Sequence, residues 1–251
     1  MARAIDARLD RPAEKAGRAP LSPARVAGAV ALAAWAGLFW FLIWSGRTSL
    51  YLSSRTDWVV PVGAIVLTGA LAGRLLLLRT KHPDALTRRE ALAIGLTVLP
   101  VVTVLALPPA SLGSFAADRR SSLASAGFAG DPADIASGEV TLVDVAAALR
   151  SGAGMQELTR RAGAEVSFVG FVTRDQGMPA DEFYLTRFLV SCCAADALSI
   201  QVRVVGAPPG RFDADTWVRA DGRLYPLGGE VIVDAARVEG VPRPSRPYLD
   251  P

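Results

Sequence analysis

The chain has 251 residues, enough for either one large domain or a membrane region followed by one small domain. Hydrophobic residues make up 51% of it, which is high for a purely soluble protein. Residues 1–138 carry 15 basic and 9 acidic side chains, whereas residues 139–251 carry 12 and 15. Because the basic excess lies in the more apolar half, it indicates membrane topology, and no nucleic-acid partner is expected.

Three apolar runs occupy residues 26–107. The first, residues 26–44, contains no charged side chain and nearly matches the roughly 20 residues that a helix needs to cross a bilayer. The second covers residues 58–78 and carries Arg74 near its end, where an arginine can reach the headgroups. The third covers residues 91–107 and contains Pro100, which membrane helices tolerate. The sequence therefore predicts three transmembrane helices in a lipid bilayer.

A cleaved signal peptide is the alternative for the first run. It fits poorly, because the basic lead-in is long and no small-residue cleavage site follows.

The flanking basic residues predict the orientation. Six lie in residues 1–25, five lie between residues 74 and 89, and two lie in the first connection, as Arg47 and Arg55. By the positive-inside rule, the tail of residues 1–25 and the second connection are cytoplasmic. Three crossings then place residues 139–251 outside the plasma membrane.

The part after the last apolar run begins with a linker and a short helix. Residues 108–138 are rich in Ala, Ser, Gly and Pro and lack periodicity, which is typical of a linker. In residues 142–149 the apolar side chains fall on one helical face, and Gly152 is expected to cap the end of that helix.

Five strand-like segments follow, each short, β-branched or aromatic, and bounded by Gly, Pro or Asp. They are "AEVSFVGFVTR", "FYLTRFLVSC", "LSIQVRVVG", "TWVRADGRLY" and "EVIVDAARVEGV". Such a series predicts a small all-β domain, and the last two segments are typical of an OB-like barrel. The proline-rich end, "VPRPSRPYLDP", is expected to be an extended packed arm or a frayed end.

Three stretches together resemble the YcgQ-like permease-subunit family of bacterial membrane proteins. They are "SGRTSLYLSSRTD", "FVGFVTRDQGMPADEFYLTRFLVSCCAADA", and "WVRADGRL" through "PYLDP". The resemblance implies a membrane anchor, an OB-like domain outside the membrane, and a YraQ- or ArsP-type permease as partner. It also marks six positions: Arg174, Asp175, Arg187, Cys192, Cys193 and Asp196.

One departure from that family concerns histidine. Many members look histidine-rich in the connection between the second and third helices, whereas this chain has only His82 there. One histidine cannot complete a closed metal site, so a cytoplasmic metal-gathering role is not expected.

Cys192 and Cys193 are the only cysteines in the chain, and four interpretations of them remain open. A vicinal disulfide would be strained, because adjacent Cα atoms lie about 3.8 Å apart and a relaxed disulfide prefers about 4.4 to 6.8 Å. Two thiolates with Asp196 could instead hold zinc, copper(I) or an arsenic species. That requires a bend, because adjacent side chains on a regular strand point to opposite faces. The remaining interpretations are plain packing and an intermolecular disulfide.

Arg174, Asp175 and Arg187 also admit two interpretations. Charges at strand ends are usually solvated or paired on the surface, which is the simpler account of these three and of Asp196. The alternative is a polar cluster beside the cysteines that orients a ligand.

The sequence carries no phosphate-binding loop, no zinc-protease helix and no histidine after residue 107 for a nucleophile–base pair, so enzymatic activity is not expected. The overall prediction is a three-helix membrane region followed by an OB-like domain, acting as an accessory subunit of a permease. Capture or handover of a soft metal or metalloid through the cysteine pair is the predicted chemistry. The alternatives are a structural partner without ligand chemistry and an envelope thiol redox sensor.

Overall fold

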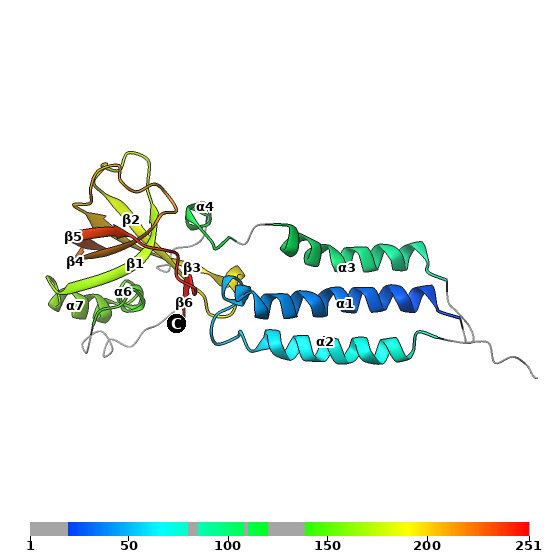
Figure 1. Ribbon diagram of the computed structural model, residues 1–251. Coiled ribbons are helices and arrows are strands. Elements are labelled where there is room, and N and C mark those ends of the chain that lie inside the picture. The colour runs from blue at the N-terminus through cyan, green and yellow to red at the C-terminus, as the bar shows by residue number, and fades with distance from the viewer. Residues whose placement is uncertain (1–19, 80–84, 108–109, 120–138, 251) are drawn as a thin grey trace, which may run out of the picture. The chain divides into compact units, whose positions relative to one another are not determined.

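The computed structural model describes residues 20–79, 85–107, 110–119 and 139–250 (Figure 1). These fall into two compact units. The first holds the described residues up to Phe41 and those from Pro61 to Leu107, and the second holds Leu42–Val60 together with the described residues after Pro108. His82 and most of the predicted linker of residues 108–138 lie outside the described residues.

The first unit contains nearly all of the three predicted membrane helices, α1 (Pro23–Trp44), α2 (Val59–Leu76) and α3 (Arg88–Ala106). All three are long and apolar enough to cross a membrane, as a multi-pass membrane protein requires. α3 begins with a capping box, in which the Thr87 side chain accepts from the Glu90 amide and the Glu90 carboxylate accepts from the Thr87 amide. Pro100 lies inside α3 without ending it.

Polar groups within this unit are satisfied between helices. The Trp40 indole N–H donates to the Thr68 hydroxyl at 3.1 Å, and the Trp35 indole N–H donates to the Thr97 carbonyl at 3.0 Å. The Phe39 ring packs against Gly63, where a side chain larger than hydrogen would overlap it. Small residues allow membrane helices to approach closely in this way.

The second unit is built around a five-stranded barrel. Its strands are β1 (Glu165–Thr173), β2 (Phe183–Leu189), β3 (Leu198–Val205), β4 (Trp217–Leu227) and β5 (Glu230–Gly240). They are joined in the order β1–β4–β5–β3–β2, and β2 pairs with β1 again to close the barrel. β3 and β5 are parallel, and the other four pairings are antiparallel. This is a mixed Greek-key barrel of the OB type, so the predicted fold class is confirmed.

Alternation along the strands builds the barrel core. On β3, Ile200, Val202 and Val204 are buried in the main core, while Gln201 and Arg203 are partly exposed. Two helices that precede β1 add to this core, α6 (Leu142–Ala148) and α7 (Gly152–Arg160). α6 matches the predicted helix. Gly152 does not cap its end; instead the Ser151 hydroxyl accepts from the Gly154 amide and starts α7.

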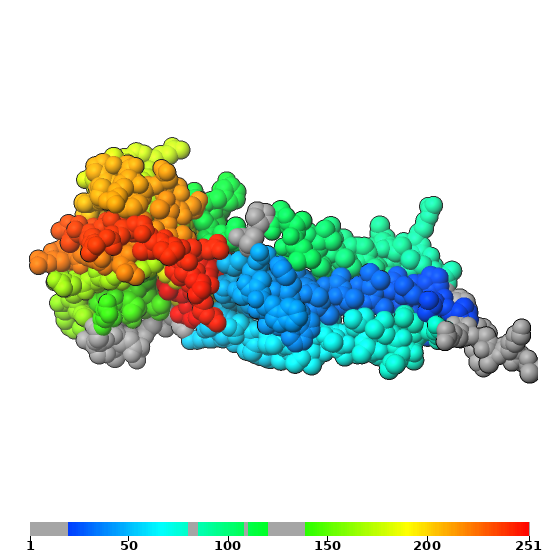
Figure 2. All heavy atoms as spheres, viewed as in Figure 1, coloured from blue at the N-terminus to red at the C-terminus, as the bar shows by residue number. Residues whose placement is uncertain are grey.

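The end of the chain is a packed arm. β6 (Tyr248–Leu249) pairs in parallel with the end of β2, next to a second small core that contains Phe171, Phe188 and Tyr248. The Tyr248 hydroxyl donates to the Leu50 carbonyl at 3.1 Å and accepts from the Leu112 amide at 3.2 Å. Figure 2 shows this end of the chain (red) lying against the residues near position 50 (light blue).

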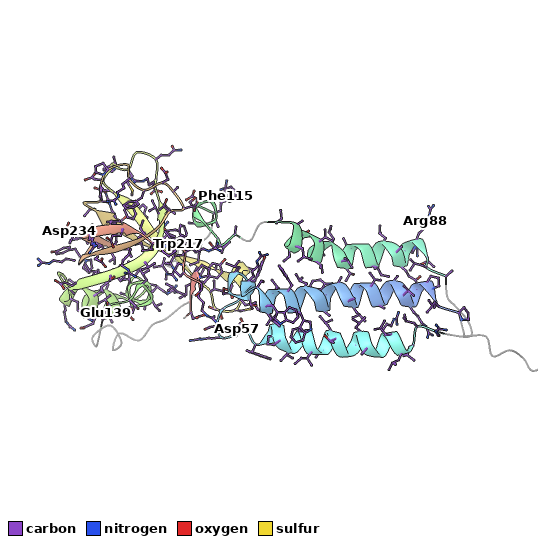
Figure 3. The ribbon with its side chains drawn as sticks, viewed as in Figure 1. Asp57, Arg88, Phe115, Glu139, Trp217 and Asp234 are labelled. Atoms are coloured by element: carbon purple, nitrogen blue, oxygen red, sulfur yellow. The ribbon has the colours of Figure 1, made fainter. Side chains whose placement is uncertain are left out.

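A short segment after the third membrane helix is bonded to Asp215, which lies just before β4. Here α4 (Ser114–Ala117) begins with the Ser114 amide and hydroxyl donating to the two carboxylate oxygens of Asp215 at 2.6 and 2.9 Å. Phe115 of α4 and Trp217 of β4 are both labelled in Figure 3. Three sequence-distant segments therefore meet at one part of the barrel: residues 42–60, residues 110–117 and the C-terminal arm.

Candidate functional site: a thiol turn between β2 and β3

The two cysteines lie in the connection between β2 and β3. β2 ends at Leu189, and after Cys193 a single 3₁₀ turn, η4 (Ala194–Asp196), leads into β3. Neither cysteine forms a disulfide; Cys192 is exposed and Cys193 is partly buried. The bend that sequence reasoning required for a shared ligand is therefore present at this position.

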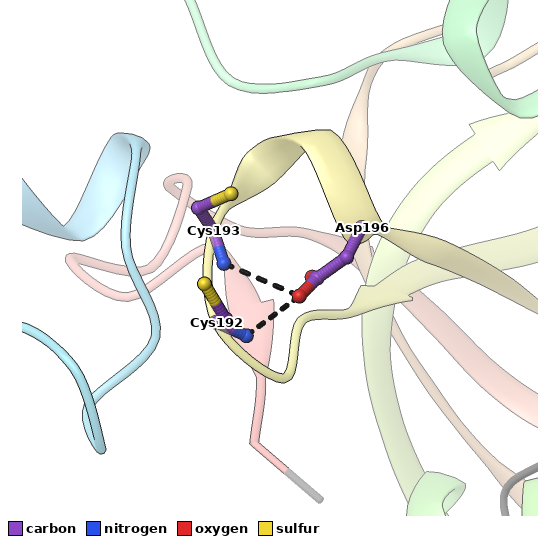
Figure 4. Close-up of side chains that lie close together, drawn as sticks. All are labelled: Cys192, Cys193 and Asp196. Carbon is purple, nitrogen blue, oxygen red and sulfur yellow. Dashed lines mark hydrogen bonds between the residues drawn. The ribbon is translucent and has the colours of Figure 1, made fainter.

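Asp196 holds the shape of this turn, which we call the thiol turn (residues 191–196). Its carboxylate accepts from the amides of Cys192 at 2.8 Å and Cys193 at 3.4 Å, as Figure 4 shows, and also from the Ser191 amide at 3.2 Å. Three amides directed at one carboxylate fold the backbone around it, and the bond from Cys193 is that of a capping box at the start of η4. Asp196 thus primarily fixes the backbone; two amides bond its Oδ2 and one bonds its Oδ1, which leaves one lone-pair site on Oδ1 for a ligand.

The geometry suits a soft ion. The sulfur atoms of Cys192 and Cys193 and a carboxylate oxygen of Asp196 all lie within 4.8 Å of one another. With metal–sulfur bonds of about 2.3 Å, two sulfurs on one ion lie at most about 4.6 Å apart. The three groups therefore need only small rearrangements to meet one ion, and the exposed position leaves room for further ligands from water or a partner.

The Cys193 side chain influences the ionisation of Cys192. The pKa of Cys192 is raised above its ordinary value, mainly by the hydrogen bond with the Cys193 side chain, then by the Cys193 charge, burial and the Asp196 charge. At neutral pH this favours the protonated thiol at Cys192. Binding of a cation must then displace the proton, because the thiolate is the ligand.

Residues 45–57, which we call the membrane connection, join α1 to α2 and pack on the thiol turn. The Cys192 carbonyl accepts from the Thr56 hydroxyl at 2.6 Å and from the Ser53 amide at 3.2 Å. The Ala194 amide donates to the Tyr51 carbonyl at 2.7 Å. The connection was singled out from the sequence only for its low basic content and its resemblance, so its contact with the cysteines is new.

Further contacts join the membrane connection to the C-terminal arm. Ser54 donates to Asp250 through both its amide, at 2.8 Å, and its hydroxyl, at 2.6 Å. An ion pair links Arg246 to Asp57 at 2.8 Å. The connection is therefore a structural part of the barrel unit and not a free loop.

Arg187 lies inside the barrel unit and not at the thiol turn. Only 7% of its surface is exposed, and its guanidinium donates to the carbonyls of Val169, Pro247 and Arg246 at 3.0, 3.0 and 3.3 Å. It also lies over the Trp217 ring, at 5.2 Å from the ring centre. Burial lowers its pKa to about 10, so it stays cationic at neutral pH. Arg187 thus links β2 to β1 and to the C-terminal arm, at the place where β1 and β2 separate and the arm lies beside β2.

Arg174 and Asp175 lie at the opposite end of β2 from the cysteines. They follow β1, whose end pairs with Tyr184 near the start of β2. The Arg174 guanidinium donates to the carbonyls of Glu182, Pro179 and Ala180, which fixes the β1–β2 connection. Asp175 lines a hollow of about 230 Å³ with Tyr184, Arg203 and Glu230. The structure therefore brings Asp196 to the cysteines but not Arg174 or Asp175.

The barrel also carries an open groove of about 690 Å³ with several carboxylates. Glu139 and Asp234, both labelled in Figure 3, line it together with Asp221 and Arg223. Asp221 accepts from the Ser167 hydroxyl at 2.6 Å. No cysteine lines this groove, and within the described residues the thiol turn is the one group of potential metal ligands whose atoms converge.

These features define a class: a protein with three helices long and apolar enough to span a membrane, an OB-type barrel, and two adjacent thiols on a barrel connection, one exposed and one partly buried. Residues 154–249 match the family model described as the DUF1980 C-terminal domain, which covers the barrel from α7 to β6 and includes the thiol turn. No curated protein and no solved structure matches the chain.

Proposed function

We propose that the protein is a membrane-anchored accessory subunit of a permease, and that it captures or hands over a soft metal or metalloid ion through Cys192 and Cys193. The observation that supports the ion chemistry is the convergence of the two sulfurs and the Asp196 carboxylate within 4.8 Å on an exposed turn. Thiolate sulfur favours zinc, copper(I) and trivalent arsenic over magnesium or calcium. The ion is the cargo in this proposal, not a resident cofactor.

An incomplete ligand set suits transfer better than storage. Two thiolates and one carboxylate leave at least one position of a four-coordinate ion to water or to another protein. Closed sites with four protein ligands hold an ion for structural purposes, whereas an open site can accept and release it. A cargo that moves between proteins needs such an open position.

The permease partner rests on the resemblance to the YcgQ-like family. A YraQ- or ArsP-type permease would receive or supply the ion. The positive-inside pattern supports an extracytoplasmic barrel, because the membrane connection carries only Arg47 and Arg55. The thiol turn would then lie at the outer side of the membrane.

Labelling of the cysteines in intact cells with a membrane-impermeant maleimide tests both location and chemistry. The chain has no other thiols, so every adduct reports on the pair. We expect labelling of untreated cells, and protection by zinc, copper(I) or arsenite. Labelling that appears only after a reductant would instead support the envelope redox sensor. Labelling only after cell lysis would contradict the extracytoplasmic location, and labelling only after denaturation would make the pair a packing feature.

A transport assay distinguishes ion handling from a purely structural role. We expect the double variant Cys192→Ser, Cys193→Ser to abolish ion protection and to impair permease-dependent transport or metal tolerance. Unchanged transport by this variant would support the structural partner instead. Because thiolates bind the ion, affinity should fall as the pH is lowered.

A further inference from the structure

The carbonyl held by the membrane connection belongs to the peptide bond between the two cysteines. Cys192 supplies this oxygen, and Ser53 and Thr56 both donate to it. The Ser53 hydroxyl donates to the preceding carbonyl, of Ser191, at 2.9 Å. Ser53 is only 2% exposed, so its own bonds are largely shielded from water, whereas the bond from Thr56 is exposed. The connection therefore fixes the orientation of the peptide unit on which both thiols are carried.

That peptide unit is part of any ring formed when one ion binds both sulfurs. The ring runs from the ion through the Cys192 side chain, along the peptide bond, and back through the Cys193 side chain. Its closure restricts the same backbone torsions that orient the Cys192 carbonyl. Ion binding and docking of the connection thus act on one peptide group.

We propose that Ser53 and Thr56 are positioning residues of the thiol site, and that docking of the membrane connection and ion binding stabilise each other. This inference rests on the proposed function. The docked connection holds the turn in the conformation in which the three ligand groups lie within 4.8 Å. By thermodynamic reciprocity, an ion that binds this conformation better also tightens docking of the connection. The connection continues into α1 and α2. Ion binding at the thiols therefore restrains the ends of these two helices more tightly.

The hydroxyl of Thr56 provides a discriminating variant. Thr56→Val keeps the shape of the side chain but removes the 2.6 Å hydrogen bond to Cys192, whereas Thr56→Ser keeps the hydroxyl. The full chain is purified in detergent and titrated with cadmium(II) as the soft-ion probe. Binding is followed through the ultraviolet charge-transfer band of cadmium thiolate. We expect Thr56→Val to weaken binding about 2- to 10-fold, the equivalent of one hydrogen bond, and Thr56→Ser to restore it.

Thr159→Val is the matched control. It removes a threonine hydroxyl that donates at 2.7 Å to the Met155 carbonyl within α7, far from the thiol turn. We expect this variant to bind cadmium(II) like the native chain. A loss of equal size in Thr159→Val would show a general effect of hydroxyl removal and would overturn the inference.

Hydrogen exchange of the native chain tests the reverse direction of the coupling. The Ser53 and Ala194 amides cross between the connection and the thiol turn, so both should exchange more slowly when cadmium(II) is bound. Equal exchange with and without bound cadmium(II), or equal affinity of Thr56→Val and the native chain, would overturn this inference alone. Failure of the native chain to form the cadmium thiolate band would overturn the proposed function as well.

Discussion

At the scale of single residues, the cysteine pair shows how a backbone turn creates a site that a strand could not. On a regular strand Cys192 and Cys193 would point to opposite faces. Asp196 gathers three successive amides of the thiol turn and ends the strand geometry there. The two thiols become neighbours that interact with each other, and this interaction can be measured through the ionisation of Cys192.

Replacing Cys193 should make Cys192 more reactive at neutral pH. The Cys193 side chain is the largest cause of the raised pKa of Cys192, so Cys193→Ala should lower that pKa. A lower pKa means more thiolate at pH 7, and the thiolate is the species that attacks a maleimide. The rate should be measured from pH 6 to 10, with tandem mass spectrometry assigning the adduct to Cys192 in the native chain. The pH dependence of the reaction rate at Cys192 has a midpoint in the native chain. A midpoint at the same or a higher pH in Cys193→Ala would contradict the prediction.

Arg187 illustrates a buried cation whose guanidinium donates to three backbone carbonyl oxygens. Arg187→Met should destabilise the barrel unit by about 2 to 4 kcal/mol, because the carbonyls of Val169, Pro247 and Arg246 lose their donor in a buried site. Arg187→Lys should recover only part of the loss, since an ammonium group cannot span three acceptors as a planar guanidinium does. Denaturant unfolding of the full chain in detergent, followed by tryptophan fluorescence, measures both. Full recovery by lysine would contradict this role.

At the scale of elements, α1 and α2 come into close contact at a small residue, Gly63. Gly63 faces the Phe39 ring, and an added side chain there would overlap it. Backbone freedom is not the issue, because the position lies within a regular helix. The contact is one of shape, as expected for helices that pack in lipid without a hydrophobic driving force between them.

Gly63→Leu should therefore destabilise the membrane unit, whereas Gly69→Leu should not. No atom beyond the backbone of its own helix lies within 4 Å of a Cβ added at Gly69, which makes it a matched control on α2. Overpacking at Gly63 should cost about 1 to 3 kcal/mol. Thermal unfolding in detergent, with resistance to proteolysis as a second readout, measures the difference. Equal stability of the two variants would show that Phe39 turns aside without cost.

At the scale of the whole molecule, the Tyr248 hydroxyl joins three distant parts of the chain. It bonds Leu50 in the membrane connection and Leu112 beyond the third helix. The ion pair between Arg246 and Asp57 joins two of the same parts, but their side chains are 52% and 33% exposed. The buried hydrogen bonds of Tyr248 should therefore contribute more to the stability of the barrel unit than the exposed ion pair does.

Tyr248→Phe should thus destabilise the barrel unit more than Arg246→Ala does. Loss of the hydroxyl leaves a buried carbonyl and an amide without their partner, at a cost of about 1 to 3 kcal/mol. Loss of the exposed ion pair should cost less than about 1 kcal/mol. Parallel denaturant titrations of the two variants in moderate salt give the comparison. The reverse ranking would mean that water replaces the tyrosine hydroxyl without penalty.

Features set by solvent could be predicted from the sequence, and features set by long-range contacts could not. Residues 26–44 form a helix without a polar face, which is stable in a lipid bilayer and would be poorly solvated in water. Apolar and polar residues alternate along β3, which predicts a half-buried strand. α7 was missed because it contains two glycines and buries only Leu158 among its apolar side chains. Arg187 carried a detectable signal: it shares its parity on β2 with the core residues Leu185 and Leu189, which indicates an inward position.

The candidate site was predicted in its ligands and not in its surroundings. Adjacent cysteines followed by Asp196 sufficed to suggest a soft-ion site. Docking of the membrane connection joins residues separated by 136 positions, such as Thr56 and Cys192, and no local pattern encodes such a pairing.

The position of β6 has a consequence for the order of events during synthesis. Ser54 and Asp250 bond across 196 positions, and Leu50 and Tyr248 across 198. The first two helices therefore leave the ribosome long before the residues that hold their connection exist. Until the arm arrives, the membrane connection lacks those partners and the carbonyls that Arg187 binds near the arm are absent. The full set of contacts that hold the membrane connection can therefore form only after residues 246–250 have been synthesised.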